Sequence, residues 1–299
     1  AYGAQDIYLT GNPQITFFKV VYRRHTNFSM ESIQQTINGS SQLTKGNTGT
    51  VTISRNGDLV SGTYLRQVGG SRHSIDWTQA ILSVELEIGG QRIDRHNREY
   101  LEIFNELTTP ASKAYGFKSM IGQGGDQGKG GVSNVYIPLR FWFCNNPGLA
   151  LPLIALQYHE VKLKFSWGNV SHSDTLNVEV WCDYIYLDTD ERRRFAQVSH
   201  EYLIEQLQVQ TEQKIGTSFK LNFNHPVKEL IWTTPGAHYF HKSDVLKLQL
   251  NGHDRFSNQY PEYFQLKQPM DYHTSVPHQN LPWYARENAE TVRAQSDAT

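Results

Sequence analysis

The chain contains 299 residues, of which 12% are aromatic and 19% are charged, and its formal net charge is −1. This length allows one large domain or two medium domains, and the aromatic-rich composition favours β-strands and tightly packed surfaces over solvated helices. The near-neutral charge excludes an overall basic field that would hold a phosphate backbone, so we expect no direct coating of nucleic acid.

Two sequence features bear on where the protein is made. No stretch approaches the roughly 18 apolar residues of a membrane-spanning helix, and the start of the chain lacks the basic and apolar pattern of a signal peptide. Cys144 and Cys182 both lie in segments with a strand pattern, and two cysteines are too few for a secreted disulfide scaffold. We therefore expect a soluble protein that is made inside the cell and keeps both thiols reduced.

Alternation of apolar and polar residues, typical of half-buried strands, dominates the first part of the chain. The predicted strands are 15–22, which follows the turn Gly11–Asn12–Pro13, and then 48–54, 81–88, 161–165 and 178–186. The Gly-rich run 122–131 between them is predicted to be a loop. Many short strands with few helices between them predict an all-β sandwich.

The clearest predicted helix runs from Asp190 to Gln206, with Asp188 or Thr189 as its N-cap. Acidic residues stand in its first turn, where they complement the helix dipole. The apolar residues of one face are Phe195, Val198, Tyr202 and Leu203. Predicted strands resume at 219–223 and 246–250, so we interpret the helix as the connection between two strand-rich domains.

An approximate internal repeat relates these two strand-rich parts. Residues 86–100 and 248–263 each contain an alternating strand, a turn of small residues, an Asp-Arg pair and a Glu-Tyr pair. The alignment requires a gap. The repeat nevertheless favours a duplication, in which the two parts share one fold.

The Gly-rich run resembles a phosphate-binding loop only in part. That motif requires a Gly at position 123 and a Ser or Thr at position 130, where the chain has Gln123 and Gly130. Without the hydroxyl the loop has no magnesium ligand, so we interpret it as a surface loop.

No set of residues in the sequence has the spacing of a catalytic or metal site. His238, His241 and the pair His159–Glu160 carry metal-ligand atoms, but no third ligand stands at a telling distance. Helix capping explains the acidic cluster Asp188–Glu191, and the sequence assigns no opposed carboxylates for glycoside hydrolysis. We therefore predict no catalytic, cofactor-binding or metal-binding residues.

Arg192–Arg193–Arg194 is the most basic run. Nucleic-acid binding would require more such residues interleaved with aromatic ones. Asp190, Glu191 and Glu201 stand close enough to neutralise the run, so we predict a salt-bridged helix surface. Sequons begin at Asn27, Asn38 and Asn169, and we interpret them as coincidental in a protein without a secretory route.

Two long blocks carry a family resemblance. The first runs from Gly3 to Lys19 and continues through Tyr22–Arg23–Arg24–His25–Thr26–Asn27–Phe28. The second runs from Phe141 to Val161 and includes the apolar segment Pro147–Leu156, which we expect to form a buried turn and strand. From about residue 2 to about residue 280, the chain resembles the major capsid proteins of nucleocytoplasmic large DNA viruses, the group of iridoviruses, phycodnaviruses and mimivirus relatives.

This resemblance implies an all-β fold of two tandem jelly rolls. Residues 1–188 would form the first jelly roll, 189–210 a helical linker, and 211–299 the second jelly roll. The resemblance further implies a non-enzymatic homotrimer of pseudo-hexagonal outline that tiles the icosahedral shell of a virion.

The same resemblance implies a set of partners and a place of assembly. The partners are other copies, neighbouring capsomers and minor capsid proteins, with an internal virion membrane nearby and assembly in the host cytoplasm. A glycan-binding β-sandwich and a carbohydrate-active enzyme are the alternatives, but neither explains the two long blocks.

The chain departs from the family pattern after about Asn280. The family would continue there into an apolar strand and further strands, whereas residues 281–299 are polar and do not alternate. A sandwich without its last strands exposes open edges. We therefore expect a second jelly roll that is incomplete or that another subunit completes.

Overall fold

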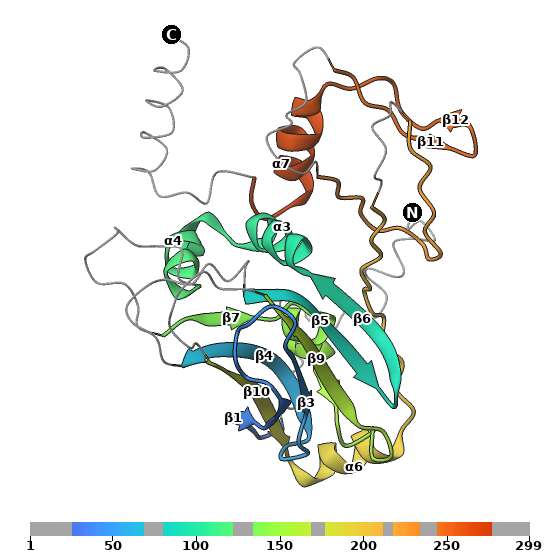
Figure 1. Cartoon of the computed structure of the whole chain (residues 1–299). Coiled ribbons are helices and arrows are strands. Elements are labelled where there is room, and N and C mark those ends of the chain that lie inside the picture. Colours follow the sequence, from blue (N-terminus) through green and yellow to red (C-terminus); the bar gives the residue numbers. More distant parts are fainter. Residues whose placement is uncertain are drawn as a thin grey trace, which may run out of the picture.

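The computed structural model of the chain describes residues 26–68, 80–121, 134–168, 177–211, 218–233 and 244–276. Two facing β-sheets make up most of the first half, up to the end of strand β10 (Asn177–Leu187) (Figure 1). Helices α3 (Arg98–Thr108) and α4 (Ala111–Met120) lie at one end of this sandwich, and α6 (Thr189–Gln197) lies at the other end.

All strand pairs in the two sheets are antiparallel. The first sheet has the order β1-β10-β4-β7, and β8 pairs with β4 as well. Besides β10 its strands are β1 (Phe28–Gln35), β4 (Leu59–Val68), β7 (Tyr136–Pro138) and β8 (Leu151–Pro152). The second sheet has the order β2-β3-β9-β5-β6. Its strands are β2 (Ile37–Gly39), β3 (Thr48–Thr52), β5 (Ile81–Ile88), β6 (Gln91–Asn97) and β9 (Val161–Trp167).

The strand order of the sandwich is that of a jelly roll. With the short strands β2 and β8 left aside, the remaining strands numbered along the chain give the orders 1-8-3-6 and 2-7-4-5 in the two sheets. Each sheet therefore mixes strands from distant parts of the sequence, as two interlocked Greek keys require. The first half of the chain is a β-sandwich of this kind.

The alternation predicted from the sequence is confirmed in four strands. The predicted segments 48–54, 81–88, 161–165 and 178–186 correspond to β3, β5, β9 and β10. In β9 the buried side chains are Val161, Leu163, Phe165 and Trp167, while the residues between them are partly exposed. The predicted strand 15–22, the Gly-rich run and residues 277–299 lie outside the described residues.

An aromatic pair lies at the centre of the sandwich. The rings of Phe165 and Trp167 stack at 4.9 Å, and both side chains are almost fully buried. The indole Nε1 of Trp167 donates to the carbonyl of Ser40 at 2.7 Å, so burial of the indole leaves no donor without a partner. Burial of each ring stabilises the fold by roughly 1.5–3 kcal/mol.

The segment around Cys144 is helical, so the prediction that this cysteine lies on a strand was wrong. Phe141, Trp142 and Phe143 are buried in consecutive positions, and α5 (Trp142–Asn145) begins at the second of them. A strand would turn every second side chain outward, whereas a helical turn lets neighbouring rings share one apolar environment. The apolar segment after it forms the predicted turn and strand, but only the strand β8 is buried; in the turn η1 (Pro147–Leu149), Pro147 and Gly148 are exposed.

The predicted helix after β10 forms, but it is shorter than predicted. Asp188 caps it by accepting from the Thr189 amide at 2.7 Å, and α6 ends at Gln197 instead of Gln206. Beyond that point the predicted apolar face is mostly exposed, with Val198 at 53% and Leu203 at 88%, although Tyr202 donates to the Ala150 carbonyl at 3.3 Å. Since helices of this length depend on tertiary packing, the chain continues without regular secondary structure.

The second half, here residues 198–276 as far as they are described, contains little sheet. The pair β11 (Gln249–Leu250) and β12 (His253–Asp254) covers only the end of the predicted strand 246–250. After it come the π-helical segment η2 (Tyr263–Lys267) and α7 (Gln268–Tyr272).

The predicted strand 219–223 is not a strand in the structure. Its main chain instead forms two hydrogen bonds with the Gln210 side chain. Gln210 Nε2 donates to the Lys220 carbonyl at 2.6 Å, and the Asn222 amide donates to Gln210 Oε1 at 2.9 Å. A glutamine amide thus replaces the ladder partner that a strand needs.

Candidate functional site: buried anchors and assembly surfaces

The arginine run of α6 is anchored to the sandwich by Asp58. Arg192 Nε donates to Asp58 Oδ1 at 2.8 Å, and the Leu187 amide donates to Asp58 Oδ2 at 2.8 Å. The carboxylate is 3% exposed and the arginine is 58% exposed. The predicted salt-bridged helix surface is therefore present at Arg192, but its partner is a residue of the sandwich that sequence proximity could not reveal.

His159 and Glu160 lie directly before β9, and both make structural contacts there. Glu160 pairs with Lys162 at 2.8 Å, and this hydrogen bond lowers the pKa of the Glu160 carboxyl. The imidazole of His159 lies against Gly89, where a Cβ atom would approach Nδ1 to 2.7 Å. Gly89 has a φ of +60°, so this position suits glycine for its backbone conformation as well.

The described residues offer no group of three or more metal-ligating side chains. His238, His241 and the Gly-rich run 122–130 lie outside them. In the same described part of the chain, no helix is both long and apolar enough to cross a membrane.

The two thiols are free and enclosed. Cys182 is fully buried on β10, and Cys144 lies within 3.4 Å of the Thr63 hydroxyl. Burial raises the pKa of Cys144 to about 11 and raises the pKa of Cys182 further still. Both are therefore protonated and unreactive in the folded state at neutral pH.

An ordered ladder of large side chains lines the outer face of the first sheet. The rings of Tyr64 and Trp181 are nearly parallel with centroids 6.3 Å apart, and the Arg66 guanidinium lies 4.8 Å from the Trp181 ring. Glu179 bonds to both Arg66 and Trp181: its Oε2 accepts from Arg66 Nε at 2.9 Å and from Trp181 Nε1 at 3.0 Å. Trp, Tyr and Arg are the residues that dominate binding at protein interfaces. Sequence reasoning missed this ladder because it depends on the pairing of β4 with β10.

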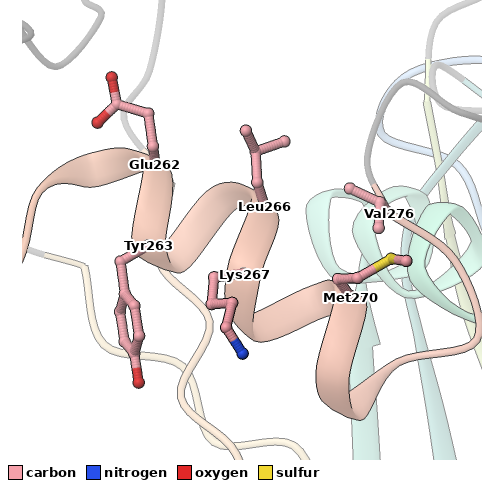
Figure 2. Close-up of a pocket in the computed structure, with 6 residues that line it drawn as sticks. All are labelled: Glu262, Tyr263, Leu266, Lys267, Met270 and Val276. Carbon is pink, nitrogen blue, oxygen red and sulfur yellow. The ribbon is translucent and has the colours of Figure 1, made fainter.

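Large apolar side chains are exposed throughout the second half. Examples are Leu203, Val209, Phe219, Val227, Trp232, Leu250 and Leu266. A shallow cavity of about 470 Å³ lies along η2 and α7, between Leu266, Met270 and Val276 (Figure 2). Exposed apolar side chains gathered in this way are typical of surfaces that contact another protein segment.

Two family models match the chain over most of its length. The model described as "Major capsid protein N-terminus" matches residues 16–188, and the model described as "Large eukaryotic DNA virus major capsid protein" matches residues 191–288. The second match extends the likeness past Asn280, where the sequence analysis placed the departure from the family.

Relatives with high identity come from several viruses. The major capsid protein of Pyramimonas orientalis virus is 54% identical, and the match covers 93% of this chain and 75% of the relative. The major capsid protein of Paramecium bursaria Chlorella virus 1 is 41% identical over 90% of this chain and 76% of the relative. Capsid protein 1 of Acanthamoeba polyphaga mimivirus is also 41% identical, over 80% of this chain and 48% of the relative.

Solved structures agree with this likeness. VP54 of PBCV-1, fitted into a reconstruction of the virophage Sputnik, has a TM-score of 0.69 and 36% identity over 88% of this chain and 78% of that chain. A quasi-atomic model of the PBCV-1 virus capsid gives a TM-score of 0.67 and 36% identity over 85% of this chain and 76% of that chain.

The jelly-roll sandwich, the exposed apolar second half and these matches define a class: the protein is a structural component of a viral capsid. The chain belongs to the major capsid protein family of large eukaryotic DNA viruses. Proteins of this family are non-enzymatic and form the capsid shell of the virion, which requires that copies associate with one another.

Proposed function

We propose that the protein forms a homotrimer in which each subunit contributes two jelly rolls, giving a capsomer of pseudo-hexagonal outline. The observation that carries the proposal is the complete jelly-roll strand order of the first half, followed by a second segment that matches its own family model from residue 191. Three subunits with two similar sandwiches each produce six lobes around a threefold axis, and such units tile a flat facet.

The domain division 1–188, 189–210 and 211–299 remains part of this proposal. It is supported by the end of the first family match at residue 188 and by the position of α6 directly after β10. The repeat of 86–100 in 248–263 also favours it, because β5 and β6 at the first site correspond to the pair β11 and β12 at the second.

The second jelly roll is proposed to be incomplete within a single copy. Its described residues expose large apolar side chains by 40% to 77%, including Trp232 and Met270, that a closed sandwich would cover. In the assembled capsomer, contacts with neighbouring copies would bury this apolar surface. The same contacts would cover the open edges of an incomplete sheet.

Minor capsid proteins and an internal membrane remain proposed neighbours of the shell, and direct binding to nucleic acid is not expected. The net charge of −1 and the engagement of Arg192 by Asp58 both argue against a basic, nucleic-acid-binding face. A glycan-binding role is disfavoured on the outer face of the first sheet. The Trp181 ring there is covered by Arg66 on one side and paired with Tyr64, so it does not offer a free stacking surface.

Electron microscopy of the purified protein tests the proposal. We expect particles with threefold symmetry and six lobes. Class averages of single, asymmetric sandwiches at all concentrations would contradict the trimer and the pseudo-hexagonal outline together.

A further inference from the structure

The second half of the chain meets the jelly roll through polar contacts at the corner of β6 and α3. The Gln206 side-chain amide donates to the Ile93 carbonyl at 2.5 Å, and the Ser275 amide donates to the Leu107 carbonyl at 3.2 Å. Figure 1 shows α7 on the same side of the sandwich as α3. Segments about seventy residues apart in the second half therefore each contact the β6–α3 part of the jelly roll.

Asp94 is the most enclosed group at this corner. Its side chain is 1% exposed, and Oδ1 accepts from the Leu207 amide at 3.0 Å and from the Arg95 amide at 2.8 Å. Oδ2 accepts from His96 Nε2 at 2.8 Å. A carboxylate with three hydrogen bonds is well satisfied as an anion, and one of the three donors belongs to the second half.

His96 fixes the orientation of this carboxylate. Its ring stacks on Phe141 at 4.6 Å and meets Tyr100 at 4.8 Å, and its side chain is 3% exposed. Nε2 carries the proton that Asp94 accepts. Nδ1 is buried and has no hydrogen-bond partner among the described residues, so the contact with Asp94 is the one polar contact of the ring within them.

The surroundings of the pair carry charges from both halves. Burial raises the pKa of the Tyr100 phenol most, and three nearby carboxylates raise it further; these are Asp94, Glu205 and Glu229. The last two belong to the second half, where Glu205 pairs with Lys228 and Glu229 pairs with His273. The neighbouring cation on the jelly roll is Arg140, whose Nε donates to Asn105 at 2.6 Å.

We infer that the Asp94–His96 pair is a polar latch that fixes the position of the second half on the jelly roll through the Leu207 amide. When the latch is open, the second half moves away from the β6–α3 corner while the jelly roll stays folded. The Asp94 carboxylate has three donors, His96 sets its orientation, and one of the donors, the Leu207 amide, lies in the second half.

Hydrogen exchange of the full chain tests the latch, with the Ser275 amide as a distant readout. Asp94→Ala removes the acceptor. Leu207→Pro removes the donor N–H from a segment outside the sandwich, and its ring also restricts the backbone at residues 206 and 207. Both variants should speed exchange at Ser275 by about 10-fold to 100-fold, because a hydrogen bond to a charged group is lost and the segments open together. His96→Phe keeps the ring between its aromatic neighbours and should give a smaller increase.

The matched control is Asp254→Ala. Asp254 is the counterpart of Asp94 in the internal repeat, but it is exposed and bonds to Gln249 and Lys247 of its own hairpin, so Ser275 should keep its exchange rate. Unchanged exchange at Ser275 in the Leu207→Pro variant overturns the latch. An equal increase throughout β9 and β10 in that variant also overturns it, since the effect would then be global loss of stability. If Asp94→Ala fails to fold, Leu207→Pro alone decides.

Discussion

Replacement of Asp58 by alanine should destabilise the jelly roll far more than removal of the Arg192–Asp58 ion pair alone. The carboxylate is 3% exposed and accepts from the Leu187 amide and from Arg192, each at 2.8 Å. Loss of the carboxylate leaves a main-chain N–H of β10 without its acceptor, which costs roughly 1–3 kcal/mol. The pair with the exposed Arg192 adds only about 0.2–1 kcal/mol, because solvent screens it. We therefore expect a loss of about 1–4 kcal/mol for Asp58→Ala.

Urea denaturation followed by tryptophan fluorescence measures this loss as a shift of the midpoint at constant slope. Two companion variants separate the contributions. Arg192→Ala removes the ion pair alone, and Asp58→Asn keeps an oxygen for the Leu187 amide, so both should lose about 1 kcal/mol or less. Equal shifts for Asp58→Ala and Arg192→Ala would refute the reasoning, since the amide bond would then contribute nothing.

Four further predictions concern buried thiols, a constrained glycine and the net charge. Without reductant, Cys144 and Cys182 should resist alkylation in the folded protein and both become modified after unfolding; a linked peptide pair would contradict this. Because burial raises the pKa of Cys144 from 9.0 to about 11, stability should be full below pH 9 and fall as the pH rises toward 11, as a denaturation series would show. Gly89→Ala should cost about 1–3 kcal/mol through its positive φ and its contact with His159, and more than Gly90→Ala, which has a positive φ and no neighbour within 4 Å. Nucleic-acid binding in about 150 mM salt should be weak, and tight binding with a steep salt dependence would contradict the role of net charge.

The strands of the first half could be predicted because each buries one face. Alternation in β5, β9 and β10 is visible in the sequence, and the same alternation selects which side chains enter the core. The segment 141–143 could not be read in this way. Three consecutive buried rings have no period of two, and the strand prediction for Cys144 failed for that reason.

Side-chain partners that are far apart in the chain could not be predicted from the sequence. Asp58 lies 134 residues before Arg192, so only the packed structure reveals that the sandwich, and not the neighbouring acids, holds the arginine. The Asp94–His96 pair is a similar case. The two residues stand two positions apart on β6, and both are buried. Their spacing is visible in the sequence, but the contact of Asp94 with the Leu207 amide is visible only in the structure.

The second half departs most from prediction, and its exposed surface explains why. Segment 219–223 has strand-forming residues but no ladder partner in a single copy, and the apolar face of the helix predicted to Gln206 is mostly exposed after Gln197. Local propensity decides a strand or helix only when tertiary contacts support it. In our proposal, neighbouring copies supply the missing contacts.

The mass of the protein in solution tests that central claim most directly. Light scattering coupled to size separation, over a hundredfold range of concentration, should give about 103 kDa, three times the 34.3 kDa of one chain. A constant mass of 34.3 kDa over the whole range would contradict the proposal that this capsid protein completes its second half by association with other copies.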